Sequence, residues 1–286
     1  MTVPNKTIGE FDMFIALQLY SVRDEMEKDY AAGLKKVKEL GYDGVELADL
    51  YDFTPEQVKK MCADSGLIPI AAHTPFGDMM CDARNIFEKY AQIGCKYIVI
   101  PHLGGDFLPG NGRFDEFVEI VKEIGSVANS LGMTLLYHNH DFEFVKVGGE
   151  YALDLMYEAI PTEFLQTELD TCWVNVGGPD PAEYILKYKG RSPVVHLKDF
   201  VMPGKKPEKM YELMGIEDTT KSGQDEKFEF RPVGYGAQDF DAILKASQSA
   251  GTQWVIVEQD QPSMGKSQIE CAAMSIETIN RLLTEC

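Results

Sequence analysis

The segment 135–144, with the sequence LLYHNHDFEF, begins as an apolar run and ends in a dense cluster of histidine, asparagine and acidic residues. Two histidines and two acids within six residues cannot all be buried without partners, because an unpaired buried charge is energetically costly. This composition is typical of a metal site or an acid–base site at the end of a buried strand. Other parts of the chain must then bring matching groups to the same place.

Histidines and isolated acids recur along the chain where apolar runs end. All five histidines lie at or near such ends, and so do four acids that interrupt apolar runs. The histidines are His73, His102, His138, His140 and His196, and the acids are Glu46, Glu143, Asp170 and Glu258. If these ends share one rim, residues far apart in the chain converge on one pocket.

Glu143, Asp170, His196 and Glu258 follow four successive apolar runs. One imidazole and three carboxylates form an oxygen-rich donor set, which suits Mn²⁺ or Mg²⁺ better than a thiolate-type zinc site and is compatible with Co²⁺ or Zn²⁺. Each acid alone could equally be a solvated carboxylate or an ion-pair partner, and His138 could serve only to orient a ligand. Four such residues together favour a metal site.

The elements that must position these residues follow a recurring pattern of a helix, a glycine, a few residues and an apolar strand. The pattern is seen at ELGYDGVEL (39–47), QIGCKYIVI (92–100), SLGMTLLY (130–137) and SAGTQWVIV (249–257). Glycine just past a helix end adopts the left-handed conformation that closes the helix. A short continuous apolar run is expected for a parallel strand covered on both faces.

Eight strands are predicted on this basis, at residues 14–20, 44–47, 69–73, 97–103, 134–143, 165–171, 194–199 and 254–259. Helices are predicted between them at 25–40, 79–93, 114–131, 151–160, 240–250 and 266–283. Two more helices are expected to begin at Thr54, followed by Pro55 and Gln57, and at Asp180, followed by Pro181, because these are helix-capping patterns.

Strict alternation of strand and helix predicts an α/β fold, a closed (β/α)8 TIM barrel in a single domain. The barrel is expected to occupy residues 14–286, after an N-terminal extension at 1–13. A doubly wound open sheet is the alternative, but no glycine-rich phosphate loop follows any predicted strand. The long irregular segment 201–231 is expected on the catalytic face, either as a lid or as a decorative or oligomer-contacting insertion.

Composition and net charge disfavour several classes of binding partner. The 286 residues carry a net charge of −19, which disfavours nucleic acid and anionic membranes. No apolar run is long enough to cross a bilayer, and no secretory signal is recognisable at residues 1–13. The six cysteines form no CxxC pair, which predicts reduced thiols and a cytoplasmic location.

Six motifs together resemble the sugar phosphate isomerase/epimerase superfamily, the group of xylose isomerase-like TIM barrels. The motifs are LQLYSVR (17–23), YHNHDFE (137–143), ELDTCW (168–173), VHLKD (195–199), VGYG (233–236) and VEQD (257–260). The resemblance covers nearly the whole chain and is not specific for one substrate. Trp173 stands where ketose epimerases of the group often have a histidine, which weakens the case for simple ketose epimerisation.

The resemblance implies one divalent metal ion held by Glu143, Asp170, His196 and Glu258, with Mn²⁺ preferred. The substrate would bind this ion through a carbonyl and an adjacent hydroxyl group. Glu143 and Glu258 would be the catalytic pair that transfers protons on opposite faces of the reacting carbon. The residues implied to contact the sugar are His73, His102, His138, His140, Trp173 and Lys198.

The activity favoured at this point is an isomerase or epimerase acting on a small sugar or sugar derivative through a metal-stabilised enediolate. A lyase on a keto-inositol or a 3-keto-glycoside is the first alternative, because it begins with the same proton abstraction. A barrel that binds metal and sugar without turnover is the second alternative. A phosphoesterase acting on DNA is the third alternative. Members of the group are often homo-oligomers, but no segment of this chain specifies an interface.

Overall fold

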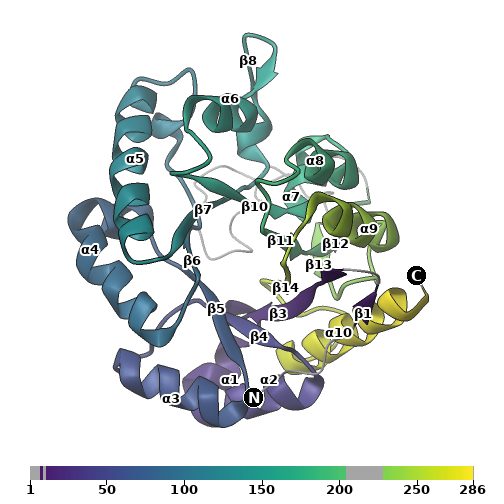
Figure 1. Cartoon of the computed structure of the whole chain (residues 1–286). Helices are drawn as coiled ribbons and strands as arrows, with labels where there is room; N and C mark the ends of the chain where they lie inside the picture. Colours follow the sequence, from purple (N-terminus) through teal and green to yellow (C-terminus); the bar gives the residue numbers. More distant parts are fainter. Residues whose placement is uncertain (1–6, 9–10, 204–227, 286) are drawn as a thin grey trace.

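The computed structural model describes residues 7–8, 11–203 and 228–285. Within them, eight parallel strands close into a barrel, in the order β10-β11-β14-β3-β4-β5-β6-β7 (Figure 1). The strands are β3 (Phe14–Gln18), β4 (Gly44–Leu47), β5 (Ile68–His73), β6 (Tyr97–Ile100), β7 (Thr134–His138), β10 (Gln166–Asp170), β11 (Val194–Leu197) and β14 (Trp254–Val257). The predicted single-domain (β/α)8 barrel is confirmed.

Helices form a ring outside the barrel (Figure 1). They are α1 (Arg23–Lys28), α2 (Tyr30–Leu40), α3 (Pro55–Ser65), α4 (Phe76–Ile93), α5 (Phe114–Ser130), α6 (Ala152–Ala159), α7 (Thr171–Gly177), α8 (Pro181–Lys187), α9 (Phe240–Ala250) and α10 (Gln268–Glu285). The predicted capping box at Thr54 is present, and the Asp180 side chain caps α8. The single helix expected at 25–40 is two helices, because Asp29 adopts an extended conformation and caps α2.

The fifth barrel strand is shorter than the sequence pattern predicts. The expected strand 134–143 ends at His138, and the chain then turns through the 3₁₀ helix η3 (Phe142–Phe144). The sixth strand also ends early, at Asp170, whose side chain caps the short helix α7. Glu143 therefore lies in η3 and not on the strand expected to carry it, and Trp173 lies in the first turn of α7.

The barrel interior is apolar at the N-terminal ends of the strands and polar at the C-terminal ends. Side chains of a strand alternate between its faces, so every second residue points inward. Along β14 the buried inward series runs from Trp254 through Ile256 to Glu258, and along β11 it runs from Val194 through His196. The apolar members form one cluster inside the barrel, which gives the polar rim a rigid base.

Among the residues that the structure describes, three short antiparallel strand pairs lie outside the barrel sheet: β1 (Thr7–Ile8) with β2 (Phe11–Asp12), β8 (Lys146–Val147) with β9 (Glu150–Tyr151), and β12 (Asp199–Val201) with β13 (Glu229–Arg231). The last pair joins the two ends of the long irregular segment 201–231. Residues 204–227 of that segment lie outside the described residues, and the extension at 1–13 stays a prediction.

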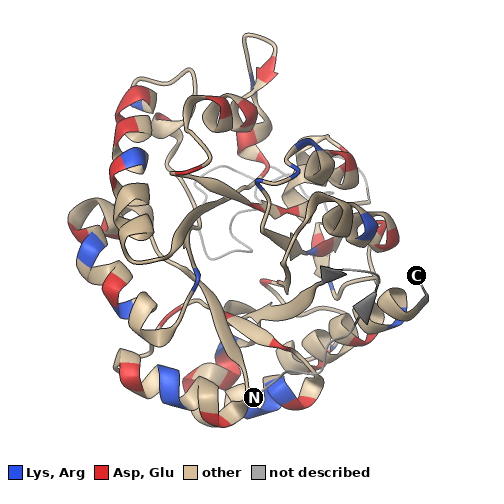
Figure 2. Cartoon of the chain, viewed as in Figure 1, with Lys and Arg blue, Asp and Glu red and all other residues tan. Residues whose placement is uncertain are grey.

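The charged residues lie mainly along the outer helices, where Asp and Glu are prominent (Figure 2). Over the described ranges, none of the helices has the length and apolar character needed to cross a membrane.

Candidate active site

Four side chains meet at the C-terminal rim of the barrel. His138, Asp170, His196 and Glu258 each offer one ligand atom, and these atoms all lie within 4.8 Å of one another. The strand register brings two of them together directly, since Asp170 pairs with His196 across β10 and β11. All four residues are buried. Three of the four predicted metal ligands are thus brought together, and His138 completes the group.

The donor atoms of this group fit a divalent cation. His138 Nε2 lies 3.6 Å from Asp170 Oδ2 and 3.9 Å from Glu258 Oε2. His196 Nδ1 lies 3.1 Å from Glu258 Oε2. Asp170 Oδ2 is buried, and it makes no hydrogen bond to any described residue. A buried carboxylate oxygen without a hydrogen bond is costly, and two imidazole nitrogens with two carboxylate oxygens are ligands that first-row divalent metals accept.

The structure does not bring Glu143 into this group. Tyr137 Oη donates a hydrogen bond to Glu143 Oε1, and the His140 backbone N–H donates one to Oε2 over 2.8 Å. The side chain is fully buried, and burial raises the pKa of Glu143 to about 7. The physical reason is the early end of β7, because the turn after His138 directs Glu143 back into the protein. Here Glu143 holds the turn that carries His140.

Lys198 is a buried cation beside the four-residue group. Its Nζ lies 2.7 Å from Asp260 Oδ2, 3.0 Å from Glu258 Oε2 and 3.6 Å from Asp170 Oδ2. Burial alone would lower the pKa of Lys198, but the charges of Asp260, Glu258 and Asp170 outweigh it and raise the pKa. The ammonium group therefore stays protonated and is shared among three carboxylates.

The Trp173 ring packs next to the Lys198 ammonium group. Lys198 Nζ lies 5.4 Å from the centre of the Trp173 ring and 5.2 Å from that of Phe230, within the range of cation–π attraction. Trp173 is fully buried and stacks on Phe228, with ring centres 5.8 Å apart. It is absent from the described lining of the cavity. The substrate contact predicted for Trp173 is replaced in the structure by contact with Lys198.

A second layer of polar residues lies beneath the four-residue group. Glu168 Oε1 is 2.9 Å from His73 Nε2, 3.1 Å from His138 Nδ1 and 3.0 Å from His196 Nε2. Glu46 Oε2 is 2.8 Å from His196 Nε2 and accepts a hydrogen bond from Gln18 Nε2 over 2.9 Å. Sequence reasoning missed Glu168, although its position two residues before Asp170 places both side chains on the same face of the strand.

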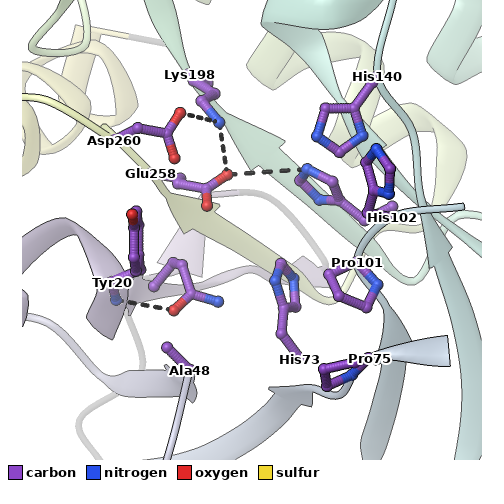
Figure 3. A pocket seen from close by; sticks show the side chains of 12 residues that line it. Tyr20, Ala48, His73, Pro75, Pro101, His102, His140, Lys198, Glu258 and Asp260 are labelled. Carbon is purple, nitrogen blue, oxygen red and sulfur yellow. Dashed lines mark hydrogen bonds and ion pairs between the residues drawn. The ribbon is translucent and has the colours of Figure 1, made fainter. Parts of the chain in front are cut away.

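A cavity of about 240 Å³ opens above the four-residue group (Figure 3). Glu258, Lys198 and Asp260 lie together on one side, and His102, His140 and Pro101 lie on the opposite side. The described residues that line it are Gln18, Tyr20, Ala48, His73, Pro75, Pro101, His102, His138, His140, Lys198, Glu258 and Asp260. Sites for drug-sized ligands are about 300–1,000 Å³, so this one suits a smaller molecule.

The histidine side of the cavity has a defined ring arrangement. The His102 ring lies edge-on to His140 at 5.5 Å and to Phe142 at 5.3 Å between ring centres. Burial lowers the pKa of His102, so this imidazole is neutral at neutral pH. The predicted sugar-binding residues His73, His102, His138, His140 and Lys198 all line the cavity. Gln18, Tyr20 and Asp260, which lie within two of the sequence motifs, also line it.

The motif VGYG (233–236) has a structural explanation. The Asp199 carboxylate accepts hydrogen bonds from the backbone N–H groups of Gly234 over 2.9 Å and Gly236 over 2.8 Å. A Cβ atom at Gly236 would collide with Asp199 Oδ1 and with the Phe200 carbonyl oxygen. Gln238 Nε2 then donates to the Lys198 carbonyl oxygen over 2.8 Å. The motif therefore fixes the backbone next to Lys198.

Comparison with known proteins agrees with this architecture. Residues 34–279 match the family model described as xylose isomerase-like TIM barrel. The chain is similar to an inosose dehydratase of Geobacillus kaustophilus, with 24% identity over 273 residues that cover 87% of this chain and 86% of the relative.

Two solved structures share the fold. One is a sugar phosphate isomerase/epimerase from Parabacteroides distasonis, with a TM-score of 0.73, 22% identity and 98% coverage of both chains. The other is a xylose isomerase-like TIM barrel protein from Mycobacterium smegmatis in complex with magnesium, with a TM-score of 0.67 and 16% identity. It covers 96% of this chain and 97% of that protein.

Proposed function

We propose, from the premise that the chain belongs to the xylose isomerase-like TIM barrel family, that this protein is a divalent-metal-dependent lyase. Its substrate would be a small, uncharged cyclic ketone of sugar type, such as a keto-inositol or a 3-keto-glycoside. The reaction would remove water or another oxygen-linked group from the carbon next to the site of proton abstraction.

The observation that carries this proposal is the placement of the two glutamates. Epimerisation by the two-glutamate route needs one carboxylate on each face of the substrate, yet Glu143 is held away from the cavity by Tyr137 and His140. Glu258 lines the cavity, and Lys198 lies 3.0 Å from it. An elimination needs a general base that removes a proton from carbon and a general acid that gives a proton to the departing oxygen. A carboxylate beside an ammonium group can supply both.

His138, Asp170, His196 and Glu258 would hold the metal ion. When bound, the ion would polarise the substrate carbonyl and lower the cost of negative charge on its oxygen. Mn²⁺ is our first proposal, and Mg²⁺, Co²⁺ and Zn²⁺ also suit mixed imidazole and carboxylate ligands. A bound magnesium ion in the Mycobacterium smegmatis neighbour supports a divalent metal without favouring Mn²⁺.

The protein's own groups would carry the protons. Glu258 Oε2 faces Lys198 and the imidazoles, whereas Oε1 makes no hydrogen bond within the described chain. Oε1 is thus available to take the proton from carbon. Lys198 would give a proton to the departing oxygen as the carbon–oxygen bond breaks. Loss of the proton from Glu258 Oε1 and uptake of a proton by Lys198 would then restore both groups, and the products would be the unsaturated ketone and water when a hydroxyl group departs.

The charges around the cavity support an uncharged substrate. Lys198 is the one cation that lines the described cavity apart from histidines, and Asp260, Glu258 and Asp170 already neutralise it. A phosphate group beside Lys198 would lie next to carboxylates that already pair with this lysine. The similarity to an inosose dehydratase also supports dehydration of a polyol ketone. The cytoplasmic location remains a prediction from the sequence.

A screen of ketoses, keto-inositols and 3-keto-glycosides with Mn²⁺ in deuterated buffer tests the proposal. Proton NMR should show deuterium entering next to the carbonyl, together with a new unsaturated ketone and loss of the leaving group. Formation of a diastereomer without elimination would instead identify an epimerase. That second candidate is kept because neutral His102 lies across the cavity from Glu258.

Lys198→Met should separate proton abstraction from elimination. We expect the elimination rate to fall by about 10²–10⁴-fold, the usual contribution of a general acid. Exchange of the substrate C–H proton should persist, because Glu258 remains. NMR of one reaction mixture reports both rates.

Removing Lys198 leaves Asp260 without its cation, and such a buried unpaired charge destabilises the fold. The double variant Lys198→Met with Asp260→Asn serves as the matched control, with melting temperature as the check. If the folded double variant loses exchange and elimination in equal measure, Lys198 does not act on the departing oxygen.

A further inference from the structure

Glu168 lies at the centre of the polar layer beneath the proposed metal ligands. Its side chain has no exposed surface. The register pairs Glu168 with His138 across β10 and β7. Residue positions two apart on β10 point the same way, so Glu168 lies directly below Asp170. It is close enough to act on the ligands without facing the cavity, whose described lining does not include it.

Glu168 Oε1 lies near three imidazole nitrogens, and it has hydrogen bonds with two of them, which fix the positions of the protons on those two histidines. Its Oε1 lies at hydrogen-bonding distance from His138 Nδ1, 3.1 Å, and from His73 Nε2, 2.9 Å. An ionised carboxylate can only accept hydrogen bonds, so both nitrogens carry hydrogen. A neutral imidazole has one N–H, which leaves the lone pair of His138 on Nε2. That nitrogen is the one that faces Asp170 Oδ2 and Glu258 Oε2.

We infer that Glu168 is a positioning residue that selects the Nδ1–H tautomer of His138 and fixes its ring, so that Nε2 is ready to bind a divalent cation. A carboxylate–histidine–metal arrangement of this kind orients the ligand and increases its basicity. The inference rests on the metal site of the proposed function. It adds a residue that the sequence motifs did not single out as functional.

The same layer could be read as a second metal site, because His73, His138, Glu168 and His196 also offer atoms within 4.8 Å of one another. The two groups share His138 and His196. Each shared imidazole would have to bind one ion through each nitrogen, and so lose both protons. Glu168 Oε1 already has hydrogen bonds with His73 Nε2 and His138 Nδ1, which N–H groups can make without an ion. One ion above a supporting carboxylate is therefore the simpler arrangement.

The first measurement uses metal-free protein with ¹⁵N-labelled histidine. The chain has five histidines, so a long-range proton–nitrogen correlation spectrum can resolve them, and His138→Gln identifies the His138 signals. We expect His138 to be an Nδ1–H imidazole in the parent chain and to lose this preference in Glu168→Leu. An Nε2–H imidazole in the parent chain would overturn the inference.

The second measurement is calorimetric titration of metal-free protein with Mn²⁺ and with Zn²⁺. Loss of a supporting residue of this kind costs about 10- to 100-fold in metal affinity, and we expect this loss in Glu168→Leu. Glu168→Gln retains an acceptor oxygen and should recover part of the affinity. If Glu168→Leu does not fold, Glu168→Gln alone should show a smaller loss and a weakened tautomer preference. Unchanged affinity in the folded variants would contradict the assignment.

His73→Gln is the matched control, since His73 is the other hydrogen-bond donor to Glu168 Oε1. It should bind one ion with an affinity close to that of the parent chain. Two ions per parent chain, with one lost in His73→Gln, would make Glu168 a ligand and overturn the inference. Neither measurement uses a substrate. A protein that passes both and transforms no ketone would therefore refute the proposed function alone.

Discussion

Glu258→Gln should lower kcat by about 10²–10⁴-fold, the usual contribution of a general base. It should also abolish exchange of the substrate C–H proton with solvent deuterium. An amide cannot accept that proton, although it keeps the size of the side chain. Glu258 and Asp260 both line the described cavity and contact Lys198, and Glu258 is also one of the four clustered candidate ligands. The measurement is deuterium incorporation by NMR at saturating Mn²⁺, with metal content determined on the same sample.

Glu143→Gln is the matched control for that experiment. Both glutamates are buried, but Glu143 accepts its hydrogen bonds from Tyr137 and His140 and does not line the described cavity. We expect Glu143→Gln to retain exchange once its melting temperature confirms folding. Undiminished exchange in Glu258→Gln, or equal loss in the two variants, would remove Glu258 from the role of base.

The barrel could be predicted from the sequence because its signals are local. Each glycine after a helix and each continuous apolar run identifies an element without knowledge of its neighbours. The strand at Gly44–Leu47 and the helix at Phe240–Ala250 have the predicted bounds. The break at Asp29 was missed because the apolar periodicity continues across it, and only the backbone conformation of Asp29 divides the helix.

The proposed site was predictable where a strand end sets the position of the residue. Asp170 ends its strand, His196 lies one residue before the end of its strand, and Glu258 follows its strand. Closure of the barrel brings the three together. Glu143 was predicted with them because residues 134–143 read as one strand. The strand stops at His138, where the polar residues begin, and the turn that follows carries Glu143 away.

Glu168 and the role of Trp173 depend on tertiary contacts that the sequence does not display. In the sequence, nothing distinguishes Glu168 within ELDTCW from an ordinary acidic residue. In the structure, the strand register places it next to His138. The sequence motif predicts that Trp173 faces the sugar. In the structure, α7 begins at Thr171, and the Trp173 side chain packs against Lys198. Both cases show that strand register and helix starts decide which polar residues face the cavity.

The metal content of three variants tests the central claim most directly, namely that His138 and not Glu143 completes the metal site. Purified protein loaded with Mn²⁺ and then dialysed should contain one ion per chain by elemental analysis. His138→Ala and His196→Ala should lose that ion, because each removes one of four donors that lie within 4.8 Å of one another. Glu143→Gln should retain it, because both carboxylate oxygens of Glu143 accept hydrogen bonds elsewhere. Loss of the ion in Glu143→Gln, with full content in His138→Ala, would contradict the account.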